Sequence, residues 1–124
     1  MKQVERVLVI DDDTTAVFLI KHVLNSIGIN EHTQVAHNGV EGLARIREAA
    51  AQGRLPQLIL LDIEMPEMNG FTFMEELAKL NLTDTRIVLL SSSQSRYDRD
   101  RATKSQAAAF LQKPLTKDKL RSII

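Results

Sequence analysis

The sequence contains no cysteine and has no excess of charge of either sign. Without cysteine the chain can form neither a disulfide nor a zinc site with thiolate ligands, but the redox compartment stays open because chains without thiols occur on both sides of a membrane. The 16 basic and 16 acidic residues cancel, so no overall positive field favours nucleic acid and no acidic tail favours a basic partner. Recognition of a partner must therefore be local.

Long hydrophobic runs are absent as well. The first apolar run, residues 7–10, is followed by three aspartates and is far too short for a signal-peptide core or a membrane span. We therefore expect a cytoplasmic protein without membrane contact. A length of 124 residues suits one ordinary domain, so we expect a single domain over residues 1–124. Its end inside an expected helix leaves open that the chain is cut from a longer protein.

The chain does contain a series of short apolar runs that end abruptly at polar residues. The run at 58–61 ends at Asp62, and Pro66 and Gly70 interrupt the loop that follows. Four consecutive apolar residues predict a central parallel strand that is buried on both faces. In open α/β sheets, ligands bind beyond the carboxyl ends of such strands. We therefore expect Asp62 to lie at the ligand-binding edge of the sheet, and the other candidate residues are located relative to it.

Apolar runs alternate with segments of helical periodicity along the whole chain. Strands are expected at 7–10, 33–37, 58–61, 87–90 and 107–111, and helices at 14–27, 40–51, 71–80, 94–106 and 117–124. We expect Gly28 to stop the first helix, Asn38 and Gly39 to form a turn, and Thr116 to cap the last helix. The segment 94–106 has few apolar residues, so its helix should be solvated and mobile. The sum predicts an α/β fold, a doubly wound five-stranded parallel sheet with five helices.

Polar residues follow four of the expected strands. Asp11 and Asp12 follow the first, Asp62 the third and Ser91 the fourth, and the last strand runs into Lys113. If all strands are parallel, these groups meet at one edge of the sheet. Neighbouring carboxylates raise one another's pKa unless a cation intervenes, and carboxylates, a backbone carbonyl and water are the oxygen ligands that Mg²⁺ takes. The pattern predicts a magnesium site.

These residues also have purely structural interpretations. Asp and Ser after a strand frequently cap the next helix, and the spacing favours that explanation for Asp13 and Ser93. Function is the better explanation for Asp12 and Asp62, because neither is followed at once by clear helical sequence. Lys113 is equally well explained as a surface lysine. The residues for which no binding role is expected are the solvent-facing His22, His32 and His37 and the loop-packing Met65 and Met68.

Five motifs stand in an order and at a spacing that are specific together, although each is weak alone. They are Val-Leu-Val-Ile-Asp-Asp-Asp at 7–13, Asn-Gly-Val-Glu at 38–41, Asp-Ile-Glu-Met-Pro-Glu-Met-Asn-Gly at 62–70, Leu-Ser-Ser at 90–92 and Phe-Leu-Gln-Lys-Pro at 110–114. With them the chain resembles, over nearly its whole length, the response-regulator receiver domain. That family is the phosphoacceptor module of two-component signalling, and the chemotaxis regulator is its best-known stand-alone form.

The resemblance implies a role for each residue of the acidic edge. Asp62 would be phosphorylated, and Mg²⁺ would bind Asp62, Asp12, the backbone carbonyl of Glu64 and, through water, Asp11. Glu64 and Ser93 would line the path of the hydrolytic water and modulate the lifetime of the acyl phosphate. A carboxylate is a poor nucleophile for phosphorus, so the site has to neutralise and align the transferring group.

The resemblance also assigns the phosphoryl contacts and the switch. Ser91 and Lys113 would hold the phosphoryl group, and the peptide bond between Lys113 and Pro114 would be cis. A phosphorylated site would draw Ser91 inward and let the Phe110 ring follow, which would change a face made by 94–106, Phe110 and 117–124. The implied partners are a sensor histidine kinase or a histidine phosphotransfer protein as donor and an unknown downstream protein on that face. No nucleic acid contact is implied, and the module is not an enzyme beyond its own phosphorylation and dephosphorylation.

The chain departs from the family pattern at four positions. Ser91 stands where Thr is common, Phe110 where Tyr or Phe occurs, and Gly42 and Gln106 where Ala and Gly are usual. The first change keeps the hydroxyl and drops a methyl group. We expect Gln106 to affect the turn before the last strand and not the chemistry.

Three other functions are alternatives to this one. An aspartyl-phosphate hydrolase would resemble Asp-x-Asp-x-Thr at the central strand, whereas residues 62–66 lack the second Asp and the Thr. A flavodoxin-like cofactor carrier needs a phosphate-binding Ser/Thr/Gly loop after the first strand, where this chain has three aspartates that would repel phosphate. A receiver-like domain with a silent site stays open.

Overall fold

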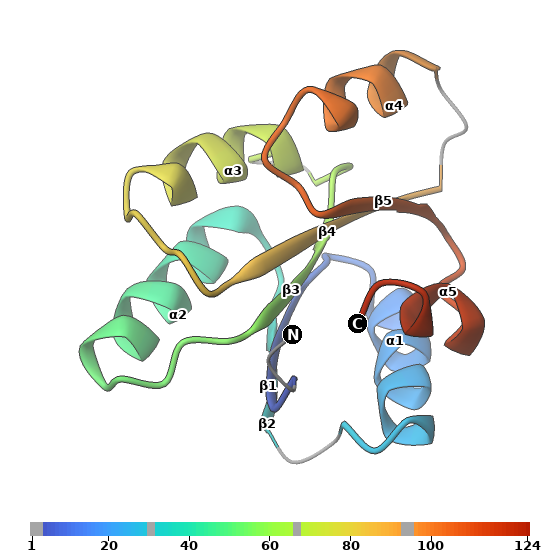
Figure 1. Cartoon of the computed structure of the whole chain (residues 1–124), viewed down its shortest axis with the longest axis horizontal. Coiled ribbons are helices and arrows are strands. Elements are labelled where there is room, and N and C mark those ends of the chain that lie inside the picture. Colours follow the sequence, from blue (N-terminus) through green and yellow to red (C-terminus); the bar gives the residue numbers. More distant parts are fainter. Residues whose placement is uncertain (1–3, 30–31, 66–67, 93–95) are drawn as a thin grey trace.

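The computed structural model describes residues 4–29, 32–65, 68–92 and 96–124. Strands and helices alternate along the chain (Figure 1). The strands are β1 (Arg6–Ile10), β2 (His32–Ala36), β3 (Leu58–Asp62), β4 (Arg86–Ser91) and β5 (Ala109–Gln112). The helices are α1 (Thr14–Ser26), α2 (Gly39–Ala51), α3 (Gly70–Ala78), α4 (Arg96–Thr103) and α5 (Lys117–Arg121). In the described part of the chain, none of the helices is long and apolar enough to cross a membrane.

The strands form one parallel sheet in the order β2-β1-β3-β4-β5. Helices α1 and α5 cover one face, and α2, α3 and α4 cover the other (Figure 1). Side chains alternate along β1, so that Leu8 and Ile10 pack on the α2 side and Val7 and Val9 on the α1 side. Strand β3 is buried along its whole length, which explains its continuous apolar run. The predicted doubly wound fold is confirmed.

Polar side chains begin most of the helices. The residues whose side chains accept an N–H of the first turn are Asp13, Asn38, Asn69 and Thr116. The expected caps at Asp13 and Thr116 are thus confirmed, and Gly28, with a φ of +86°, follows α1 as expected. The prediction of an Asn38–Gly39 turn is wrong. Asn38 Oδ1 accepts the N–H of Glu41, so Gly39 is the first residue of α2.

Several element boundaries differ from the sequence-based expectation. Strand β2 begins and ends one residue earlier than expected, and β5 begins two residues later. Helix α4 ends at Thr103 rather than 106, and Ala102 is its one buried residue within the described range. Helix α5 ends at Arg121 rather than 124, and the last two isoleucines instead lie half-buried against the α1-side core. These differences lie away from the acidic edge, which keeps its predicted place.

Candidate functional site

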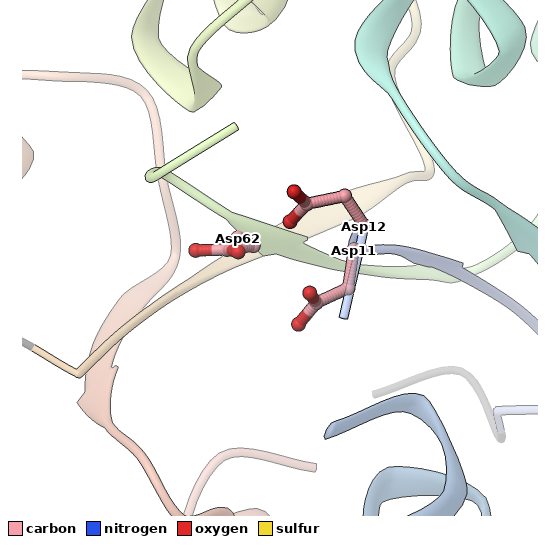
Figure 2. Close-up of side chains that lie close together, drawn as sticks. All are labelled: Asp11, Asp12 and Asp62. Carbon is pink, nitrogen blue, oxygen red and sulfur yellow. The ribbon is translucent and has the colours of Figure 1, made fainter. Parts of the chain in front are cut away.

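Three aspartates meet at the carboxyl edge of the two central strands. Asp11 and Asp12 follow β1, and Asp62 is the last residue of β3, which pairs with β1 in parallel. Figure 2 shows the three carboxylates gathered at this edge. One oxygen of each lies within 4.8 Å of those of the other two. Asp11 and Asp62 are buried and Asp12 is exposed, so the cluster opens to solvent on the Asp12 side.

Lys113 places its side-chain ammonium group in this cluster. Its Nζ lies 2.8 Å from Asp11 Oδ2 and 3.4 Å from Asp62 Oδ2. The backbone holds Lys113 beside the end of β4, because the Lys113 N–H donates to the carbonyl of Ser91 at 2.7 Å. The peptide bond between Lys113 and Pro114 is cis, as the resemblance implied. The side chain is 18% exposed. An ordinary surface lysine would not be held between two buried carboxylates, so the structural interpretation of this residue is not supported.

The electrostatics of the cluster follow from burial. Loss of solvent raises the pKa of Asp62 to about 6. The hydrogen bond from the Glu64 N–H and the charge and hydrogen bond of Lys113 oppose this rise, whereas the negative charge of Asp11 adds to it. Burial alone would lower the pKa of Lys113, but its hydrogen bond to Asp11 and the charges of Asp62 and Asp11 outweigh burial and raise it. Three carboxylates thus face one ammonium group. The site has an excess of negative charge that a cation would offset.

The donor set fits a hard divalent cation. The candidate ligands are oxygen atoms, and the exposed Asp12 gives access from solvent. The loop after β3 turns back on the acceptor, because the Glu64 N–H donates to Asp62 Oδ1 at 2.9 Å. This turn keeps the backbone of Glu64 beside the cluster. A glycine helps to hold the loop in place, since a Cβ on Gly70 would lie 2.8 Å from the Cα of Ile63.

Ser91, the last residue of β4, is fully buried next to the cluster. Its Oγ donates to Glu64 Oε1 at 2.6 Å, and the Oγ of the exposed Ser92 donates to Glu64 Oε2 at 2.9 Å. The family resemblance implies for Glu64 only a backbone carbonyl ligand and an effect on lifetime, and neither includes these side-chain hydrogen bonds. The sequence does contain a signal for this contact. Glu64 stands two residues beyond the end of β3, and two serines stand at the end of the neighbouring strand β4. Ser93 lies outside the described residues.

The elements of the expected readout face lie around the edge strand β5, with α4 on one face of the sheet and α5 on the other (Figure 1). Phe110 is half-buried in β5 and packs against the core on the α2 side. Tyr97 in α4 is 70% exposed. The guanidinium group of Arg101 lies 4.3 Å from the centre of the Phe71 ring, which links α4 to α3. Sequence reasoning did not find this contact.

The remaining sequence expectations concern side chains without a binding role. All three histidines are exposed, as predicted. Met65 is buried in the core and Met68 packs against it, so the interpretation of both as loop packing is confirmed. The sequence patterns do not single out Phe18 in α1, an aromatic side chain that is 69% exposed beside Leu19 at 46%.

Comparison with known proteins agrees with this geometry. A family model described as the response regulator receiver domain matches residues 7–124. The sensor histidine kinase CheAY of Helicobacter pylori is 33% identical over 95% of the chain, which spans 14% of that protein. The two-component response regulator ORR41 of rice is 32% identical over 96% of the chain and 91% of that protein. The chain spans about half or less of the length of several curated relatives.

Solved structures share the fold. The crystal structure of a two-component response regulator from Cytophaga hutchinsonii superposes with a TM-score of 0.88 at 30% identity, covering 98% of this chain and 95% of that one. Chemotaxis protein CheY4 of Vibrio cholerae superposes with a TM-score of 0.80 at 24% identity, covering 98% of this chain and 100% of that one. The second likeness concerns the fold alone.

Proposed function

Because this chain belongs to the response regulator receiver domains of two-component signalling, we propose that it accepts a phosphoryl group on Asp62 in a Mg²⁺-dependent reaction. The observation that carries the proposal is the position of the Asp62 carboxylate. It is buried at the end of the central strand, among Asp11, Asp12 and Lys113. An apolar core has little structural use for such a cluster, since burial of a carboxylate is costly and one ammonium group here serves two buried carboxylates.

The proposed reaction transfers a phosphoryl group from a phosphohistidine. A carboxylate oxygen of Asp62 forms the new bond to phosphorus while the bond from phosphorus to the imidazole nitrogen of the donor breaks. The imidazole leaves with the bonding electron pair and takes up a proton. The Glu64 N–H holds Oδ1 of Asp62, which fixes the orientation of the carboxylate and leaves Oδ2, on the Lys113 side, for the new bond.

The residues around Asp62 would handle the charge of the transferring group. Lys113, already 3.4 Å from Asp62 Oδ2, would bind the phosphoryl oxygens together with the Ser91 hydroxyl. Asp12, Asp62, the Glu64 backbone carbonyl and, through water, Asp11 would hold Mg²⁺, which supplies positive charge to the carboxylates and the phosphoryl oxygens when bound. Glu64 and Ser93 would modulate the lifetime of the acyl phosphate.

The proposed donor is a sensor histidine kinase or a histidine phosphotransfer protein. Support comes from relatives that are named as histidine kinases in Helicobacter pylori and Dictyostelium discoideum. The proposed readout is a change in the face of α4, β5 and α5, driven by Ser91 and Phe110, that a downstream protein would recognise. The balanced charge of the chain gives no reason to expect nucleic acid contact.

The test is phosphorylation by a small phosphodonor with Mg²⁺, followed by intact mass and peptide mapping. The wild type should gain one acid-labile phosphate on Asp62, and Asp62→Asn should gain none. Asp100→Asn, which changes an exposed carboxylate of α4, should behave as wild type. A wild type that stays unmodified would make this a receiver domain with a silent site, and an Asp62→Asn variant that is modified at the wild-type rate would place the acceptor elsewhere.

A further inference from the structure

The carboxylate of Glu64 binds two hydroxyl groups at the end of the neighbouring strand. Ser91 Oγ lies 2.6 Å from Oε1, and Ser92 Oγ lies 2.9 Å from Oε2. The shorter distance is in the range of hydrogen bonds from a hydroxyl to an ionised carboxylate, which are roughly twice as strong as neutral ones. Both oxygens of Glu64 are thus engaged, and the side chain bridges the loop after β3 to the end of β4.

This bridge uses a proton that the proposed phosphorylated state also needs. A serine hydroxyl has one hydrogen to donate. In the structure the hydrogen of Ser91 goes to Glu64, whereas in the phosphorylated domain it would go to a phosphoryl oxygen on Asp62. Both acceptors are anionic and both are reached from the same buried hydroxyl. Formation of one hydrogen bond therefore requires loss of the other.

We propose that Glu64 is a latch that holds the unphosphorylated state, because its carboxylate competes with the phosphoryl group for the Ser91 hydroxyl. This inference rests on the proposed function and concerns its regulation. It differs from an effect on the hydrolytic water, since it acts when the phosphoryl group arrives and before the acyl phosphate is hydrolysed. Ser92 contributes by orienting the second carboxylate oxygen, so it is a positioning residue of the latch.

A simpler explanation is that the Glu64 charge repels the incoming anion, and one substitution separates the two. Glu64→Asp keeps the charge but shortens the side chain by one methylene, so it cannot span both serines. Under the latch it should behave like Glu64→Ala, and under repulsion like the wild type. Every variant at this position keeps the backbone carbonyl proposed as a metal ligand, and an unchanged Mg²⁺ dependence of the melting temperature would check that.

The experiment is a titration with beryllofluoride, a phosphoryl mimic, in the presence of Mg²⁺, followed by amide spectra. Loss of a hydrogen bond to a charged group predicts about tenfold tighter binding for Glu64→Ala and Glu64→Asp, and about threefold for Ser92→Ala. Glu75→Gln, which neutralises an exposed carboxylate of α3, is the matched control and should bind like the wild type.

The outcomes of this titration are distinct. Equal affinity in the wild type and Glu64→Ala would overturn the latch while leaving the proposed function intact, as would a Glu64→Asp variant that binds like the wild type. Binding of the mimic by Glu64→Ala and Glu64→Asp but not by the wild type would support the latch in its strongest form. If no variant binds the mimic or takes up phosphate, the proposed function fails and the latch with it.

Discussion

The ammonium group of Lys113 is closer to Asp11, at 2.8 Å, than to Asp62, at 3.4 Å. In the unphosphorylated domain the lysine therefore mainly neutralises the carboxylate that is not the proposed acceptor. Asp62 keeps a raised pKa in spite of its cationic neighbour. A phosphoryl group on Asp62 would compete with Asp11 for the lysine, so cation binding near Asp11 and phosphorylation should support each other.

In the absence of Mg²⁺, removal of the Lys113 ammonium group should lower the free energy of unfolding. Lys113→Met leaves Asp11 and Asp62 buried without a cation, and the loss of one partner of a buried pair costs about 3 kcal/mol. Urea unfolding should show this loss, and Mg²⁺ should restore part of it. The control is Lys79→Met, which breaks an exposed pair with Glu76 and should change stability by less than about 1 kcal/mol. Equal effects of the two substitutions would contradict the assignment.

The raised pKa of Asp62 predicts a pH dependence of stability in the absence of metal. The folded domain keeps this proton up to about pH 6, whereas an unfolded chain releases it near 3.8. The contribution of Asp62 to stability is therefore full below about pH 4 and is lost as the pH rises through about 6. Asp62→Asn should remove this slope and be more stable than the wild type at pH 7.5 by roughly 3 kcal/mol. Urea midpoints at pH 5 and 7.5 test it, and a variant with the wild-type slope would count against the shift.

Two adjacent aspartates should respond in opposite ways. Mg²⁺ binding to the folded state should raise stability by roughly 1–3 kcal/mol at tens to a hundred times Kd, and Asp12→Ala should remove most of that gain. Asp13→Ala should lose about 1 kcal/mol, because Asp13 accepts the Thr15 N–H as the cap of α1, and should keep the Mg²⁺ response. Melting temperatures with and without Mg²⁺ measure both effects. An unchanged response in Asp12→Ala would place the metal elsewhere.

The contact between Arg101 and Phe71 should stabilise α4 locally. A cation–π contact at an exposed site is worth about 0.5–1 kcal/mol, so Arg101→Met should speed amide exchange in α4 about two- to fivefold. Arg99→Met changes another exposed arginine of the same helix and is the control. Native-state hydrogen exchange would measure the difference, and equal acceleration by both substitutions would argue against a role of the ring.

The proposed switch predicts a response far from the site. With beryllofluoride, amide shifts should extend from the loops around Asp62 to residues 97–104, because the Phe110 ring follows Ser91. Phe lacks the hydroxyl that would stabilise a solvated ring position, so the inward state should be populated before phosphorylation more than with Phe110→Tyr. Shifts confined to the loops around Asp11, Asp62 and Lys113 would mean that the proposed switch is absent.

The sheet and its acidic edge could be predicted from the sequence because both depend on local patterns. Apolar runs that end at Asp11, Asp62 and Ser91 specify strands, and parallel pairing then brings their ends together. The sequence does not distinguish a turn from a helix start at Asn38, because Asn followed by Gly suits both. The choice between a turn and a helix start depends on how the neighbouring strand and helix pack in the fold.

The contacts of Glu64 and Arg101 could not be predicted in the same way. Glu64 meets Ser91 across 27 positions of sequence, and the contact depends on how the loop after β3 turns back. Arg101 likewise meets Phe71 from a different helix. Neither contact leaves a periodic signal, because each joins single side chains whose directions are set by packing.

The exposure of Asp12, beside two buried carboxylates, has a kinetic consequence. A cation can reach the cluster from solvent along this carboxylate without any opening of the core. Exchange of the ion should therefore be much faster than local unfolding of β1 or β3, which are buried on both faces. The occupancy of the site would then stay in rapid equilibrium with the free Mg²⁺ concentration and would not depend on whether an ion was bound earlier.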